Sequence, residues 1–210
     1  MDSKQVRMTN GKTVFQFGAI DCFTRKRVVG LAPRLTSQEG ARFLHKVLSG
    51  FPFPVQAIQS DGGSEFLGDF GKTVTELQLA HYFNRPNYPQ GNGRIERSFR
   101  TDDDEFYHVQ ELPADIGGLE TALLAWNHVY ETRRPHQALG YLTPERFYQQ
   151  WVATNHQKKG GGVRYVLTQH TRLTRPRPRL TMFGEACPEL VEGRPAHAQR
   201  PGRDPGLPHL

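Results

Sequence analysis

Polar and apolar residues alternate along the first third of the chain. The apolar positions are mainly β-branched or aromatic, which is typical of strands. We therefore predict strands over Ser3–Met8, Thr13–Ile20 and Arg27–Leu31. The pair Asn10-Gly11 between the first two strands is a hairpin signature, and residues 21–26 join the second strand to the third. These three strands are expected to form an antiparallel meander.

A helical period replaces the alternation after the meander. Apolar residues at helical spacing predict one amphipathic helix that ends at Gly50; they are Phe43, Leu44, Val47 and Leu48. Ser37 is the predicted N-cap, and Gly40 stands where a capping box would have an acid. The chain thus turns from sheet to helix.

Short strands and longer helices then follow one another. The predicted elements are a strand over Pro54–Ser60, a helix over Phe66–Leu79, a strand over Ala80–Phe83, and helices over Arg94–Tyr107 and Leu119–Tyr130. Residues 84–92 contain two prolines and a glycine, so they are predicted to form a loop. This order of elements indicates an α/β fold.

The composition changes after Trp151. Residues 158–162 read Lys-Lys-Gly-Gly-Gly, and arginine alternates with proline over residues 172–179. Segments so poor in large apolar residues cannot bury enough surface to fold. We predict a core domain of residues 1–150, followed over 151–210 by a linker and a disordered C-terminal tail.

Charge narrows the possible partners. The chain has 27 Lys and Arg against 21 Asp and Glu, a net charge of +6, which suits a polyanion such as DNA but also serves solubility. Cys22 and Cys187 lack the paired spacing of a zinc site. No apolar run approaches the ~20 residues of a membrane span, and no signal-peptide core follows Met1, so a cytoplasmic protein without a membrane partner is expected.

Two acidic residues have the spacing of a metal-dependent phosphodiester site. Asp61 follows the predicted strand at a Gly-Gly turn, and Glu96 lies 35 positions later, one turn inside a helix that opens after the proline-rich loop. Carboxylates on such elements can converge on a pair of divalent cations, and such pairs catalyse in-line displacement at phosphorus.

These residues belong to longer motifs. They read DSKQV from Asp2, FQFGAIDCFTRKRVVG from Phe15, AIQSDGGSEF from Ala57, NRPNYPQGNGRIERSFRTDDDEFY from Asn84, and WNHVYETRRPHQALGYLTPERF from Trp126. Together the motifs resemble the integrase catalytic core of bacterial insertion-sequence transposases and retroviral-type integrases, over roughly residues 2 to 150.

The resemblance implies a ribonuclease H-like fold. One five-stranded mixed sheet, the meander plus parallel strands, would be flanked by helices. It also implies that Asp2, Asp61 and Glu96 form an Asp-Asp-Glu triad that binds two Mg²⁺ or Mn²⁺ ions. The implied partners are DNA, at transposon ends and target, and further copies of the chain in a homo-oligomer.

Each acid also has a structural interpretation. Asp61 before two glycines suits a plain turn, and Glu96 could pair with Arg100 on a solvated helix face. Asp2 stands at the chain terminus, where strands fray. Asp21 is a rival first acid, although it lies in a hairpin turn. The acidic run 102–104 is predicted to face solvent.

Basic residues on the Glu96 helix predict contacts with DNA. Arg94, Arg97 and Arg100 recur every three positions, while Ile95 and Phe99 pack inward. The preceding loop adds Tyr88, Gln90 and Asn92 as candidate DNA contacts. Solubility is the alternative role for the arginines. The WNHVYETRRPHQALG motif reads as a helix end with an X-Pro turn, so a structural role is predicted for it.

The leading hypothesis is a truncated transposase that cleaves transposon ends and joins the 3′-OH to target DNA. The helix-turn-helix that usually precedes such cores is expected to be missing. Gly62 stands where the family has Asn. Weak activity is therefore expected, as is a gain in activity when strand-forming residues are added before Met1. A catalytically inactive remnant that only binds DNA is the alternative, and a ribonuclease acting on RNA–DNA hybrids shares the fold.

Overall fold

The N-terminal strands form the predicted meander. The computed structural model describes residues 1–84 and 92–158 of the 210-residue chain. Strands β1 (Asp2–Arg7), β2 (Thr13–Ile20) and β3 (Arg27–Ala32) pair antiparallel in the order β1-β2-β3. Gly11, with a φ of 80°, closes the first hairpin in the left-handed region that glycine tolerates. The periodicity and the turn chemistry both predicted this arrangement.

The two remaining strands form a separate parallel pair. Strand β4 (Ala57–Ser60) pairs with β5 (Ala80–Phe83). The expected single five-stranded sheet is thus a three-stranded and a two-stranded sheet among the described residues. The Met1 amino group donates to the Gln59 carbonyl oxygen, so β1 begins beside β4. The two sheets meet at the first residue of β1, which leaves no continuous ladder between β1 and β4.

Helix α1 (Ser37–Gly50) ends where the sequence predicted, but its cap differs. The N-cap is Thr36, whose hydroxyl accepts a hydrogen bond from the Glu39 amide, and Ser37 is the first helical residue. Both residue types cap well, so the sequence alone does not distinguish them.

The helix expected over Phe66–Leu79 is split. A 3₁₀ turn, η1 (Ser64–Phe66), precedes α2 (Gly68–Glu76), because Gly68 has a φ of 50° and interrupts the helix. Further on, α3 (Gly93–Asp102) passes into a π-helical turn, η3 (Asp103–Tyr107), and α4 (Ile116–Thr132) follows. These two helices agree with the predicted ranges to within a few residues, apart from the π turn.

The last helix was not predicted. After the turn η4 (Gln137–Leu139), helix α5 (Pro144–Lys158) runs through the expected domain boundary at residue 150. Its start has ordinary helix signals, because the Thr143 hydroxyl accepts from the Arg146 amide and Pro144 occupies the first turn. Residues 159–210, where the tail was expected, lie outside the described residues.

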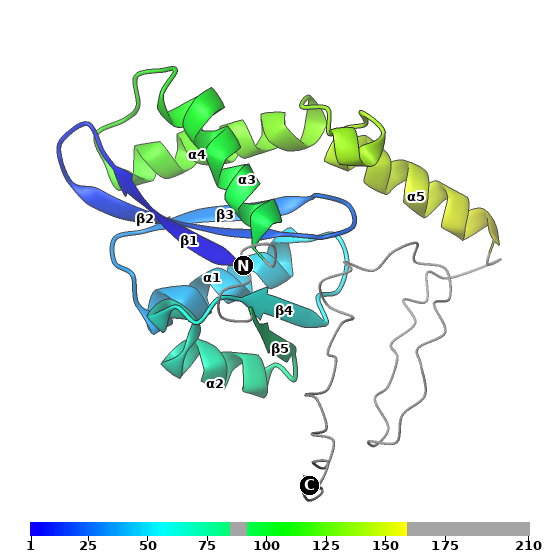
Figure 1. The fold of residues 1–210 in the computed structure, drawn as a ribbon, viewed down its shortest axis with the longest axis horizontal. Coiled ribbons are helices and arrows are strands. Elements are labelled where there is room, and N and C mark those ends of the chain that lie inside the picture. Colours follow the sequence, from blue (N-terminus) through cyan, green and yellow to red (C-terminus); the bar gives the residue numbers. More distant parts are fainter. Residues whose placement is uncertain (85–91, 159–210) are drawn as a thin grey trace, which may run out of the picture. The chain divides into compact units, whose positions relative to one another are not determined.

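Helices cover both faces of the three-stranded sheet (Figure 1). Alternate residues of the strands point to opposite faces. Phe17 and Val28 pack with Phe43 and Leu44 of α1 in one core cluster, whereas Val29 belongs to a second cluster that includes side chains of α4 and η3. The sheet is therefore buried on both sides, and α3 crosses the end of the sheet where the chain begins.

Candidate metal and DNA site

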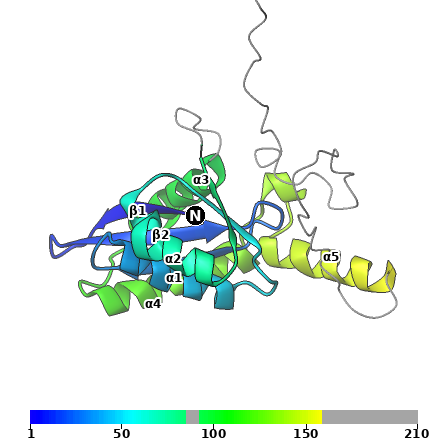
Figure 2. The same ribbon diagram turned by 90° about the horizontal axis from the view of Figure 1, so that it is seen from below.

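Asp2 opens β1 on the face that is covered by α3. It pairs across the ladder with Gly18. A Cβ added at Gly18 would lie 2.8 Å from the Phe99 ring and 2.9 Å from Cδ1 of Ile95. Only glycine therefore lets α3 lie this close to the sheet. Figures 1 and 2 both show the N-terminal end of β1 beside the start of α3. The register and this close approach bring Asp2 near the first turn of α3.

Asp61 follows β4 in a turn that is tied to β1. Its Oδ1 accepts a hydrogen bond from the Gly63 amide at 3.2 Å. The hydroxyl of Ser3, next to Asp2, donates to Oε1 of the buried Glu65 at 2.5 Å. A Cβ at Gly40 of α1 would lie 2.2 Å from the Glu65 carbonyl oxygen, so glycine lets α1 support the turn from behind. The turn that carries Asp61 is thus held between β1 and α1.

Glu96 lies in the first turn of α3 with its side chain exposed. Its amide donates to the Asn92 carbonyl oxygen. The buried Ile95 and Phe99 hold the opposite face of α3 against the sheet. A carboxylate in a first helical turn is stabilised by the positive end of the helix dipole.

The Asp2 carboxylate lies in the electrostatic field of the other two acids. Its pKa is raised to about 6, mainly by burial and, less strongly, by the charges of Asp61 and Glu96, while the Ser3 amide and the chain's amino terminus oppose the increase. A divalent cation would offset this negative charge, and three carboxylates are the hard oxygen donors that Mg²⁺ and Mn²⁺ prefer. The donor chemistry therefore fits the implied ions.

The three side chains are of the right chemical type for a metal site, but they are not arranged around one. Over residues 1–84 and 92–158, no group of three or more His, Cys, Asp or Glu side chains is arranged to hold a metal ion. Oδ1 of Asp2 accepts from the Ser3 amide at 2.8 Å, as Oδ1 of Asp61 does from Gly63. Both acids thus have one oxygen hydrogen-bonded to a nearby backbone amide.

Four of the six candidate DNA residues lie in the described part of the chain, directly after its gap at residues 85–91. Arg97 and Arg100 are exposed on α3, whereas Arg94 and Asn92 are half-buried. Tyr88 and Gln90 lie outside the described residues. The face of α3 opposite Ile95 and Phe99 therefore carries exposed positive charge close to Glu96.

The rival acid Asp21 has a structural role. Its Oδ2 accepts hydrogen bonds from the amide and the hydroxyl of Thr24, at 2.7 and 2.6 Å. Its carbonyl oxygen accepts from Arg25, which has a φ of 61°. Asp21 stabilises the β2–β3 turn, as its position in the sequence suggested.

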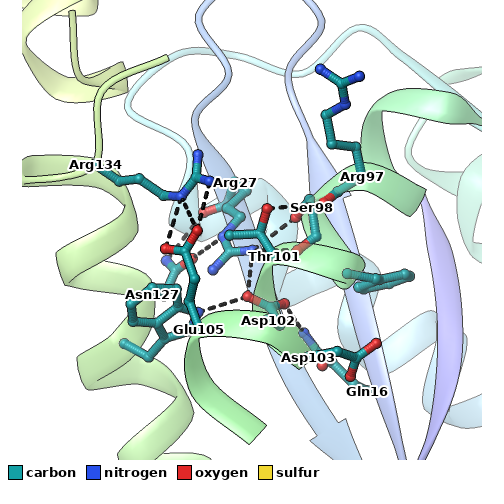
Figure 3. A network of polar contacts seen from close by, with 12 residues as sticks. Gln16, Arg27, Arg97, Ser98, Thr101, Asp102, Asp103, Glu105, Asn127 and Arg134 are labelled. Atoms are coloured by element: carbon teal, nitrogen blue, oxygen red, sulfur yellow. Dashed lines mark hydrogen bonds and ion pairs between the residues drawn. The ribbon is translucent and has the colours of Figure 1, made fainter. Parts of the chain in front are cut away.

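The acidic run 102–104 differs from the prediction. Asp102 is fully buried, with a side chain 0% exposed, while Asp103 is half-buried and Asp104 is exposed. The Asp102 carboxylate forms an ion pair with the buried Arg27 of β3 at 2.8 Å (Figure 3). The prediction that the run faces solvent was therefore wrong for Asp102, because its partners lie far away in the sequence.

The WNHVYETRRPHQALG motif supports the same region from α4. Oδ1 of Asn127 accepts from Nε of Arg27 at 2.8 Å, and the Tyr130 ring lies 3.5 Å from the Arg27 guanidinium carbon. Glu131 accepts from the Arg27 amide and, together with Glu145, from the ammonium of Lys26. These contacts agree with the structural role predicted for the motif.

Comparisons with known proteins agree with this fold. Residues 77–144, which include Glu96 and all of α3 and α4, match the family model described as Integrase core domain. A protein described as an integrase, ORF3 of Spiroplasma virus SpV1-C74, is 24% identical over 153 residues. The match covers 65% of this chain and 42% of that protein, so the chain spans less than half of this relative's length.

Solved structures show the same architecture. The catalytic core domain of BIV integrase superposes with a TM-score of 0.53 at 19% identity, covering 75% of this chain and 95% of that one. A chain of the simian T-cell lymphotropic virus intasome in complex with PP2A regulatory subunit B56 gamma has a TM-score of 0.51 at 16% identity. That match covers 64% of this chain and 49% of the other.

The fold is thus of the α/β class found in retroviral integrase cores. The resemblance that the motifs indicated is confirmed: residues 77–144 match the integrase core model, and the chain is similar to a viral integrase in sequence and to retroviral integrase cores in fold. No helix within residues 1–84 and 92–158 is long and apolar enough to cross a bilayer.

Proposed function

We propose that this chain acts in DNA integration as a metal-dependent polynucleotidyl transferase. The observation that carries the proposal is that the start of β1, the turn after β4 and the first turn of α3, which carry Asp2, Asp61 and Glu96, lie near one another. The Met1–Gln59 contact brings β1 to β4, and the Asp2–Gly18 pairing brings β1 under α3. The pKa of Asp2 responds to burial and then to both of the other acids.

The three carboxylates would hold Mg²⁺ or Mn²⁺, two ions in the full site. When bound, the ions activate the attacking water or 3′-OH and stabilise the charge that develops on the phosphate. The chain's own contribution is to hold the acids. Ser3 and Glu65 tie the β1 end to the Asp61 turn, and Ile95 and Phe99 fix the helix that presents Glu96.

DNA is the proposed substrate, at transposon ends and at the target. Arg97 and Arg100 are exposed beside Glu96, where they can contact phosphates and hold the backbone across the acids. The match to the integrase core model and the viral integrase relative support this substrate class. Assembly as a homo-oligomer is proposed from the likeness to an intasome chain.

Substitution of two acids tests the proposal. Asp61→Asn and Glu96→Gln should abolish Mn²⁺-dependent nicking of supercoiled DNA, because each removes a metal ligand. Both should leave DNA binding nearly intact, because neither removes a phosphate contact. Asp104→Asn is the matched control, since Asp104 is an exposed acid on η3. Nicking by the two site variants at the rate of the control contradicts the assignment.

A second candidate function is DNA binding without catalysis. One oxygen of Asp2 and one of Asp61 accept hydrogen bonds from nearby backbone amides, and no metal-holding group of three side chains is present in the described part of the chain. This reading predicts that the unchanged chain retains DNA in a gel-shift assay and produces no nicked circles in Mn²⁺. Nicking that depends on Glu96 excludes it.

A further inference from the structure

The buried Asp102 carboxylate receives donors from three elements. Oδ1 forms an ion pair with Nη1 of Arg27 on β3 at 2.8 Å and accepts a hydrogen bond from the Trp126 indole on α4 at 2.7 Å. Oδ2 accepts from the Gln16 amide on β2 at 2.8 Å, and Gln16 in turn accepts from the Tyr107 hydroxyl at 2.9 Å. The C-terminal end of α3 is thereby joined to two strands and one helix.

A second contact joins Arg27 to α3 one turn earlier. Nη1 of Arg27 also donates to the Ser98 hydroxyl at 2.8 Å, and its Nε donates to Asn127 (Figure 3). Ser98 is buried as well. Arg27 therefore contacts α3 at Ser98 and at Asp102, while its own position is set by α4.

These two contacts determine how α3 presents Glu96. Each helical residue turns by about 100° and rises about 1.5 Å, so fixing Ser98 and Asp102 fixes both the rotation and the axial position of the helix. Glu96 lies two residues before Ser98 on the exposed side. Glu96 itself needs no contact with the network to be oriented by it.

The network is better suited to fixing the position of α3 than to stabilising the folded state. A buried ion pair must first offset the loss of hydration of both charges, so well-packed apolar residues are often as stable in its place. Directed hydrogen bonds fix a unique position for each partner, which apolar packing does not do. Groups behind a metal ligand commonly set its orientation in this way.

We propose that Asp102 and Arg27 are positioning residues that set the direction of the Glu96 carboxylate toward the metal site. This inference rests on the proposed function and extends it to a buried network that touches neither metal nor DNA. The acidic run at 102–104 thus contains one residue with a role in the site and two without.

Amide hydrogen exchange tests whether Asp102 holds α3. Asp102→Asn should accelerate exchange across Gly93–Asp102, whereas Asp103→Asn should not, because Asp103, the neighbouring acid at the start of η3, forms only a partly exposed pair with Lys4 of β1. Trp126→Phe is the milder variant, since it removes one donor but retains a ring to stack on Phe106. Equal exchange in the Asp102, Trp126 and Asp103 variants overturns the proposal.

A double-substitution cycle tests whether Asp102 acts through Glu96. Mn²⁺ affinity is measured by the electron paramagnetic resonance signal of free Mn²⁺. Asp102→Asn should weaken binding about tenfold in the unchanged chain and not at all in the Glu96→Gln background. The same loss in both backgrounds contradicts the positioning role. If the unchanged chain shows no Mn²⁺ binding sensitive to Glu96→Gln, the proposed function itself fails, which is a different result.

Discussion

At the scale of single residues, the missing side chain of Gly18 leaves the space into which α3 packs. Gly18 pairs with Asp2 and lies under Ile95 and Phe99, so it sets the distance between β2 and α3. Glycine in the FQFGAID motif lets α3 approach the sheet closely, which the proposed site requires of the helix that carries Glu96. Gly62, which also stands near the site, has open space around it.

We expect Gly18→Ala to lower both stability and activity. The added Cβ would overlap the Phe99 ring and Ile95, and forced repacking of this kind costs roughly 1–3 kcal/mol. Displacement of α3 should reduce Mn²⁺-dependent nicking further than the loss of folded protein explains. Thermal unfolding and nicking per folded molecule measure the two effects. Gly62→Ala is the control and should change the midpoint little; equal effects of both substitutions contradict the close-packing argument.

At the scale of elements, α3 has two faces with different tasks. Ile95, Ser98, Phe99 and Asp102 are buried, while Glu96, Arg97 and Arg100 are exposed. One helix therefore docks on the sheet with one face and presents an acid and two cations with the other. This division is what the proposed function requires of α3, because an acid for the metal site and cations for phosphate would share one short helix.

Replacing Arg97 and Arg100 with alanine should weaken binding to unrelated DNA sequences. If both arginines contact phosphates, the salt dependence of the binding constant becomes shallower by about one to two units. Binding titrations at several salt concentrations measure the slope. The matched control replaces Arg42 and Lys72, exposed cations of α1 and α2. A slope that changes equally in both variants indicates a general charge effect.

Helix α5 and the residues after it should differ in their contribution to stability. Phe147 and Trp151 of α5 stack edge-on against Phe23 in the β2–β3 turn. Removing residues 144–210 should therefore lower the thermal midpoint by roughly 5 °C or more. Removing only 159–210, which is poor in large apolar residues, should shift it by about a degree or two. Equal midpoints for the two truncations would show that α5 contributes no packing.

At the scale of the whole molecule, one buried polar system joins sheet and helices. It extends from Gln16 and Arg27 through Asp102 to Asn127 and Tyr130, and His136 lies beside it. Burial, then the charges of Arg134 and Arg27, lowers the pKa of His136 from its ordinary value to about 4. Between pH 6.5 and about 4, the His136 imidazole is therefore mainly neutral in the folded chain and mainly protonated in the unfolded chain.

His136 should destabilise the folded state as the pH falls below about 6.5, whereas the raised pKa of Asp2 acts in the opposite direction. Between pH 6.5 and the lowered pKa of about 4, His136 binds a proton in the unfolded chain but not in the folded chain, so a fall in pH favours unfolding through this residue. His136→Phe keeps a ring against Tyr130 and removes this proton. Denaturant unfolding at pH 7 and pH 5 should show a smaller loss for the variant than for the unchanged chain. Equal losses indicate that His136 does not contribute.

Local sequence determined most of the elements and the candidate acids. Alternation and turn chemistry predicted the meander, helical periodicity predicted α1, α3 and α4, and the motifs singled out Asp2, Asp61 and Glu96. These features depend on residues that are close together in the chain, so the spacing of those residues predicts the local structure directly. Helix α5 was missed although Thr143 and Pro144 mark its start.

Tertiary structure alone decided which charged residues are buried. Asp102 stands in a run that reads as a solvated surface, and Arg27 begins a strand that reads as an ordinary edge, yet both side chains are fully enclosed. Their enclosure depends on Gln16, Ser98, Trp126 and Asn127, which come from separate elements. A buried charge is stable only when such distant partners compensate it. The residues next to a charge in the sequence do not show which distant partners it will have.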